Sequence, residues 1–269
     1  MRLPWRPIRW LQRTVNAWLL GYLLSSLPAA EWVWEHPAIP HLPAPPGIAS
    51  MVTHAFGTWL PPQGAMIAVL VVMALALRGI VFPARWYFTL IQWVLFSSLV
   101  NFAWLTSTGG HQLMVNVLFW MILLPAKEPD AGTRSGVKDV LHLAAFWIIR
   151  LQLLAAYAVT GIQKLTGSHW LAGDAMSIVA TDTAYGPAWL ASVPALAVIM
   201  NYAVLLFQLT FPMAVWWERT RGWWMLMGIV FHLSTGIAFG ILDMGLAFLA
   251  VYPIWSRRGE DAAPAPVSA

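Results

Sequence analysis

The chain repeats one pattern along most of its length: an apolar stretch long enough to cross a lipid bilayer, then a short connection. A transmembrane helix needs about 20 predominantly apolar residues. Hydrophobic residues make up 59% of the sequence and charged residues only 10%, which is far from a soluble domain. We therefore predict an all-α, multi-pass transmembrane bundle of seven or eight spans without a soluble domain. The predicted apolar segments are 10–27, 64–82, 86–105, 112–125, 142–163, 192–216, 223–242 and the shorter 244–255.

The connections show no boundary between separate domains. Residues 1–255 are expected to form one membrane domain, and the polar, Pro- and Ala-rich residues 256–269 a disordered tail. The stretch 28–62 is rich in proline and contains neither Lys nor Arg. It is predicted to be an ordered or partly helical loop between the first two spans.

Positive charges lie almost entirely in alternate connections. Cytoplasmic loops of membrane proteins carry an excess of Lys and Arg, so fourteen of the fifteen cations mark the cytoplasmic side. Eight crossings then place both termini there, in an inner (cell) membrane protein. The basic balance reflects topology and does not indicate nucleic-acid binding. The fourteen are Arg2, Arg6, Arg9, Arg13, Arg78, Arg85, Lys127, Arg134, Lys138, Arg150, Arg219, Arg221, Arg257 and Arg258.

Lys164 is the fifteenth cation, at the opposite end of an apolar segment. A lysine there can simply extend to the lipid headgroups. It can also act chemically, because burial disfavours the charged form of an amine and a neutral amine is a usable general base. Trp170 and His169 follow within two turns, and three acidic residues fall on the same predicted side and could hold loops or pair with Lys164. These are Asp174, Asp182 and Asp243.

Two histidines are candidates for the same chemistry. His111 begins the segment that follows "TSTGG", on the predicted outer side, where an ordinary hydrogen bond is the simpler role. His232 lies in the middle of an apolar segment, where an imidazole needs a partner, so satisfaction by another helix competes with catalysis.

Several site types are excluded or weakly supported by the sequence. The chain has no cysteine, which excludes thiolate metal ligands and disulfides. There is no Walker loop, no dinucleotide fingerprint and no GxSxG motif. His36, His41 and His54 share a loop, but their spacing matches no metal pattern, so no metal is predicted. The hypothesis that the chain is a small transporter is supported only by its predicted multispan architecture.

The stretch "IIRLQLLAAYAVTGIQKLTGSHWLAGDAM" (148–176) resembles the signature of the vitamin K-dependent gamma-carboxylase membrane domain and its bacterial relatives, the HTTM family. Upstream "GGHQLM" and downstream "GIVFHLSTGIAFGILDMGLAFLAVYPIW" resemble the histidine-bearing helices of that family, so the resemblance covers roughly 70–255. The matching residues of the central signature are Arg150, Gln152, Tyr157, Gly161, Lys164, Leu165, Trp170 and Gly173.

The resemblance implies a membrane enzyme acting on a reduced, vitamin K-like quinone. Lys164 would be the base that deprotonates the quinol, and His111 would orient it or relay protons. Oxygen and carbon dioxide are the implied co-substrates, for quinone epoxidation and for carboxylation of a peptide glutamate. The residues assigned to quinone binding are His232, Trp170, Arg150, Gln152 and Tyr157.

The chain also departs from the carboxylase pattern. Gln163 stands where the carboxylase has a second lysine, and the large lumenal domain that grips the substrate does not follow the last apolar segment. Quinol chemistry depends less on that domain than carboxylation does. The expected partners are the lipid bilayer, a lipophilic quinol, and a small peptide substrate or a soluble partner protein. The alternative is a non-carboxylating HTTM protein that acts in maturation of, or immunity to, a small secreted peptide.

Overall fold

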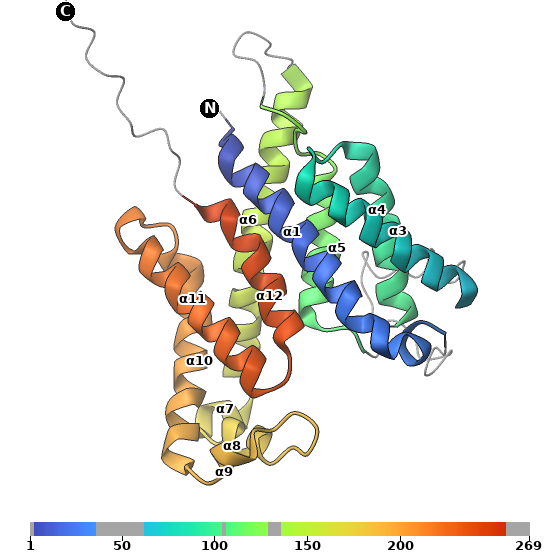
Figure 1. Ribbon diagram of the computed structural model, residues 1–269. Helices are drawn as coiled ribbons and strands as arrows, with labels where there is room; N and C mark the ends of the chain where they lie inside the picture. The colour runs from blue at the N-terminus through green and yellow to red at the C-terminus, as the bar shows by residue number, and fades with distance from the viewer. Residues whose placement is uncertain (1–2, 36–61, 104–105, 129–135, 257–269) are drawn as a thin grey trace, which may run out of the picture. The chain divides into compact units, whose positions relative to one another are not determined.

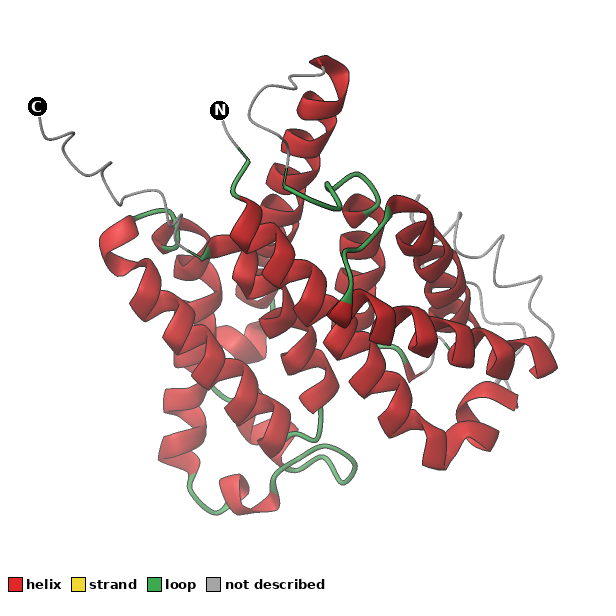
Figure 2. Ribbon diagram, turned by 45° about the horizontal axis from the view of Figure 1, so that its top comes forward, coloured by secondary structure: helices red, strands yellow, loops and turns green. Residues whose placement is uncertain are grey.

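The computed structural model describes residues 3–35, 62–103, 106–128 and 136–256, and every regular element among them is helical (Figures 1 and 2). This confirms the predicted all-α class. The chain forms two compact units. The first comprises residues 1–149 and 250–269, and the second comprises residues 150–249.

The first unit contains four complete helices, the beginning of α6 and the end of the chain. α1 presents an apolar stripe at helical spacing, and five of its side chains have no exposed surface: Ile8, Leu11, Val15, Leu19 and Leu23. α1 contacts α3 and the 3₁₀ turn η4, and α3, α4 and α5 pack in succession. The bounds are α1 Trp5–Ser26, η1 Leu27–Ala29, η2 Glu31–Glu35, α3 Pro62–Val81, α4 Trp86–Phe102, α5 Gly109–Met121, α6 Gly136–Leu165 and η4 Tyr252–Trp255.

Buried amides connect helices inside this unit. The Gln92 side-chain amide donates to Asn16 Oδ1 (2.8 Å), and Asn16 Nδ2 donates to the carbonyl of Gln12 (2.7 Å). A methyl group at Gly79 would lie 2.5 Å from Asn16, so glycine lets α3 approach α1 here. Because lipid offers no hydrogen bonds, such polar side chains must find partners between helices.

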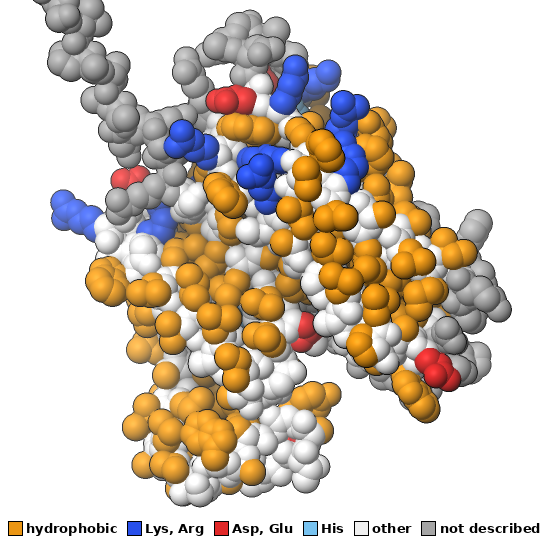
Figure 3. Space-filling model, viewed as in Figure 1, with side chains coloured by type: hydrophobic (Ala, Val, Ile, Leu, Met, Phe, Trp, Pro, Cys, Tyr) orange, Lys and Arg blue, Asp and Glu red, His pale blue; other side chains and the backbone are white. Residues whose placement is uncertain are grey.

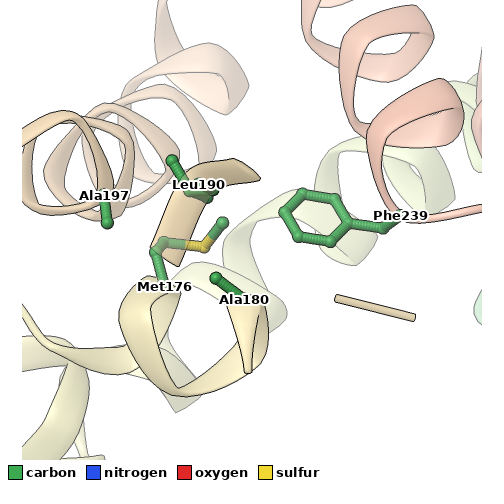
Figure 4. Packing of buried hydrophobic residues seen from close by; sticks show 5 residues of the cluster. All are labelled: Met176, Ala180, Leu190, Ala197 and Phe239. Atoms are coloured by element: carbon green, nitrogen blue, oxygen red, sulfur yellow. The ribbon is translucent and has the colours of Figure 1, made fainter. Parts of the chain in front are cut away.

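The second unit contains the rest of α6, three short helices, α10, α11 and most of α12. An apolar cluster joins the short helices to α10 and to the end of α11, as Figure 4 shows for Met176, Ala180, Leu190, Ala197 and Phe239. Its elements are α7 Ser168–Ala172, α8 Ala175–Ala180, α9 Ala188–Ala191, α10 Pro194–Ala214, α11 Glu218–Ala238 and α12 Leu242–Val251.

Each predicted apolar segment falls largely on a helix. Among the described residues, three helices are long and apolar enough to cross a membrane, namely Gly64–Val81, Gly136–Leu165 and Pro194–Ala214. The number of spans and the extent of the single membrane domain stay predictions. Within the Pro-rich stretch, the turns around Leu27–Ala29 and Glu31–Glu35 are helical. Residues 36–61 and 257–269, including the predicted tail, lie outside the described residues.

Candidate functional site

Lys164 lies in the last turn of α6, and its ammonium faces an aromatic ring. The helix ends at Leu165, the Gly167 N–H donates to the Lys164 carbonyl (3.1 Å), and the Trp170 N–H donates to the Gly167 carbonyl (3.1 Å). This turn brings the Trp170 ring centroid to 5.0 Å from Lys164 Nζ, which is cation–π geometry. Lys164 is half-buried, and no carboxylate in the described part of the chain forms an ion pair with it.

α10 holds the α7 turn that carries Trp170. The Asn201 side-chain amide donates to the Trp170 carbonyl (2.9 Å), and the Tyr202 hydroxyl donates to the Leu171 carbonyl (3.0 Å). Gly173 ends α7 in the left-handed region (φ 86°), and a methyl group there would lie 2.9 Å from the Tyr202 hydroxyl. Trp170 is therefore fixed at its backbone beneath the lysine.

Two of the three acidic residues on the predicted outer side hold loops. Asp174 pairs with His169 (3.1 Å) at the surface. The Asp182 carboxylate accepts hydrogen bonds from the N–H groups of Ala184 (2.8 Å) and Tyr185 (2.9 Å). Asp243 lies in the first turn of α12.

A buried polar pair lies deeper in the same unit. The Tyr157 hydroxyl of α6 is hydrogen-bonded to Nε2 of His232 on α11, and the two side chains are 1% and 3% exposed. The Phe248 ring of α12 stacks on His232 at 4.8 Å, and the Phe211 ring of α10 lies 4.5 Å from Tyr157. His232 thus has a partner on another helix, as an imidazole at this depth requires.

Close helix packing supports this pair. A methyl group at Gly245 of α12 would lie 2.5 Å from the His232 carbonyl oxygen. Only a residue without a side chain allows α12 to approach α11 this closely. The aromatic ring of Phe248, one turn further along α12, is thereby brought against the imidazole.

The predicted residues of α6 occupy different levels of the helix. Tyr157 and Lys164 are seven residues apart, on the same face and about 10 Å apart along the axis. Arg150 and Gln152 precede Lys164 by about 21 and 18 Å at 1.5 Å per residue. The structure therefore brings together Lys164 with Trp170 and Tyr157 with His232, but it separates Arg150 and Gln152 from Lys164.

His111 belongs to the first unit. It occupies the third position of α5, where its Nδ1 accepts a hydrogen bond from the N–H of Thr108 (2.8 Å) in a capping box. Its buried ring lies 4.3 Å from Tyr22 and 5.6 Å from Trp18. The predicted approach of His111 to Lys164 stays a prediction.

The sequence interpretation missed the buried amides of α10. Asn201 is 0% and Gln208 is 9% exposed. The spacing of seven residues between two polar residues in an apolar segment could have predicted this burial, because polar residues in such segments face the bundle interior. The described residues contain no cluster of three His, Asp or Glu side chains that could hold a metal ion.

Residues 50–258, more than half of the chain, match the family described as HTTM domain. No curated protein and no solved structure shows a significant match to the chain.

Proposed function

Because the chain belongs to the HTTM family, we propose that it is an integral membrane enzyme that binds a lipophilic quinol at the end of α6 and deprotonates it with Lys164. The observation that carries this proposal is the half-buried Lys164 amine, which faces the Trp170 ring at 5.0 Å.

The residues around Lys164 fit an apolar, aromatic ligand. Ile162, Leu165 and Leu171 are exposed on this part of the unit and offer apolar surface to a molecule that arrives through lipid. The amine and the Trp170 ring supply one polar and one aromatic contact. A bound hydroquinone supplies an acidic O–H and, with oxygen, the capacity for oxidation.

Proton transfer needs only groups that this chain holds in place. Neutral Lys164 Nζ accepts the proton of a hydroxyl group, which leaves an oxyanion on the ligand and an ammonium on the lysine. The face of the Trp170 ring attracts the new ammonium through its quadrupole. The hydrogen bond from Asn201 to the Trp170 carbonyl keeps this contact in place throughout the step.

Further steps extend the proposal. Epoxidation with O₂, and carboxylation of a peptide glutamate with CO₂, are the reactions that the family resemblance suggests after deprotonation. A small peptide or a soluble partner protein would provide the glutamate. We also propose eight crossings of the inner membrane with both termini cytoplasmic, because fourteen of the fifteen cations lie in alternate connections or in the helices next to them.

The direct test is turnover by the purified full chain in detergent. Menadiol is added with oxygen, and quinone and epoxide are measured by chromatography and mass spectrometry against a heat-inactivated sample. Protein-dependent epoxide supports the proposal. If product formed no faster than in the inactivated sample, a peptide-handling role would replace the enzymatic one.

A further inference from the structure

We propose that Asn201 and Gln208, two buried amides on α10, bind the hydroxyl groups of the quinol through their side-chain carbonyl oxygens. This inference rests on the proposed function, since it names the groups that hold the ligand beside Lys164. It assigns a binding role to two residues that the resemblance did not point to.

Both oxygens are buried acceptors without a donor. Asn201 Oδ1 and Gln208 Oε1 have no hydrogen-bond partner among the described residues, and their side chains are 0% and 9% exposed. A buried acceptor that stays unpaired is destabilising, so each such atom in a folded protein calls for an explanation. The Asn201 Nδ2 group is already bound to the Trp170 carbonyl, which fixes the amide orientation and leaves Oδ1 as the free atom.

The packing of α6 against α10 places these amides near the Lys164 turn. A methyl group at Gly161 would lie 3.3 Å from the backbone carbon of Gln208, so Gly161 and Gln208 are at the same level. The hydrogen bond from the Asn201 amide to the Trp170 carbonyl places Asn201 at the level of Trp170. Lys164 follows Gly161 by one turn of α6, and its Nζ lies 5.0 Å from the Trp170 ring centroid.

The spacing of the amides suits a hydroquinone. Asn201 and Gln208 are seven residues apart, on one face of α10 and about 10.5 Å apart along the axis. A hydroquinone that donates from both ends spans roughly 11 Å between its acceptors, given O–H···O distances of about 2.8 Å. The neighbouring Lys164 can accept a proton, whereas an amide oxygen can only accept a hydrogen bond. One hydroxyl group would stay hydrogen-bonded to its amide and orient the ligand, while the proton of the other would leave its amide for the Lys164 amine.

The test compares two ligands that differ in one chemical property. Menadiol, kept reduced under anaerobic conditions, has two O–H donors, and 1,4-dimethoxy-2-methylnaphthalene has the same ring system with none. Binding of each to the purified full chain in detergent is measured by equilibrium dialysis. The wild-type protein is expected to bind menadiol more tightly than the dimethoxy compound.

Gln208→Met keeps the size of the side chain and removes its acceptor. We expect it to weaken menadiol binding about 2- to 10-fold, the effect of one net hydrogen bond, and to leave binding of the dimethoxy compound unchanged. The matched control is Gln163→Met, at an exposed position beside Lys164 on α6, which should change neither affinity. Asn201→Leu should weaken menadiol binding at least as much, since it also loses the bond to Trp170.

Each other outcome has a defined meaning. If wild type bound both ligands equally, or if Gln208→Met weakened both equally, the amides would be packing groups and the inference would be wrong. If Gln208→Met and Asn201→Leu left the preference for menadiol intact, the inference would fail while the proposed function stood. If wild type bound neither ligand, the proposed function itself would fail, and the inference with it.

Discussion

Lys164 differs from Arg9 and Arg221 in what its side chain contacts. Arg9 donates to the carbonyl of Phe82 (3.0 Å), and Arg221 donates to that of Val215 (2.9 Å), so both stabilise turns at helix ends. Lys164 has an aromatic ring as its described contact. The carbonyls stabilise the charged guanidinium groups, and the ring face likewise attracts an ammonium, so the contact with Trp170 positions the Lys164 side chain.

Replacing Lys164 separates a base from an anchor. We expect Lys164→Ala to lower quinol-dependent activity about 10²- to 10⁴-fold, the usual contribution of a general base. Lys164→Arg should be equally inactive, because a guanidinium keeps the charge but does not deprotonate at neutral pH. Initial rates with menadiol measure both, and size-exclusion profiles control for folding. Full activity of Lys164→Arg beside inactive Lys164→Ala would make the amine an electrostatic group.

The Tyr157–His232 pair makes a separate prediction about stability. Tyr157→Phe should lower the free energy of unfolding by about 0.5–2 kcal/mol, because it leaves the imidazole without its hydroxyl partner inside the bundle. Adding His232→Phe removes the second polar group, so the double variant should lose less than the sum of the two single changes. Thermal unfolding in detergent measures all three. Strict additivity would show that the pair does not contribute as a unit.

At the scale of elements, α7 is held to α10 by close contact as well as by hydrogen bonds. Gly173→Ala adds strain at φ 86° and a clash 2.9 Å from the Tyr202 hydroxyl. We expect it to destabilise the protein by more than the about 1–2 kcal/mol that the left-handed conformation alone costs. The activity with menadiol should also fall, because Trp170 moves with the turn.

Gly240→Ala is the matched control for this prediction. Gly240 has φ 67°, and a methyl group there meets no atom within 4 Å among the described residues. The variant therefore carries the strain without the clash and should retain activity. Equal losses of stability and activity in the two variants would remove the role assigned to the contact between Gly173 and Tyr202.

The elements also show which parts of the fold were readable in the sequence. Long apolar runs predicted the main helices because each must satisfy its backbone within the bilayer. The short helices Ser168–Ala172, Ala175–Ala180 and Ala188–Ala191 were missed, since four to six residues cannot show a periodicity. The polar positions Asn201 and Gln208 were visible, but their partners depend on how α10 packs, which one sequence does not specify.

At the scale of the whole molecule, the pattern of charge and hydropathy in the sequence predicts the fold class, but it does not predict how the helices pack into units. The apolar runs that recur along the chain predict helices and membrane character, and three helices in the part of the chain that the structure describes have the length and composition to cross a bilayer. The division into residues 150–249 and the remainder had no marker in composition, because the boundary falls within α6 and α12. A boundary inside a continuous helix leaves no loop or change in composition by which the sequence could predict it.

The topology makes the last prediction. Fourteen of the fifteen Lys and Arg lie in alternate connections or in the helices next to them, so a reporter enzyme that is active only outside the cytoplasm should give no signal when fused after residue 269. The same reporter inserted in the cation-free stretch 28–62 should be active, which controls for expression. Lys164 would then lie on the outer side, at the end of a helix that begins near the cytoplasm. A strong signal from the C-terminal fusion would contradict this topology. It would place Lys164 at the cytoplasmic face, where its ligand would enter from the cytoplasmic leaflet.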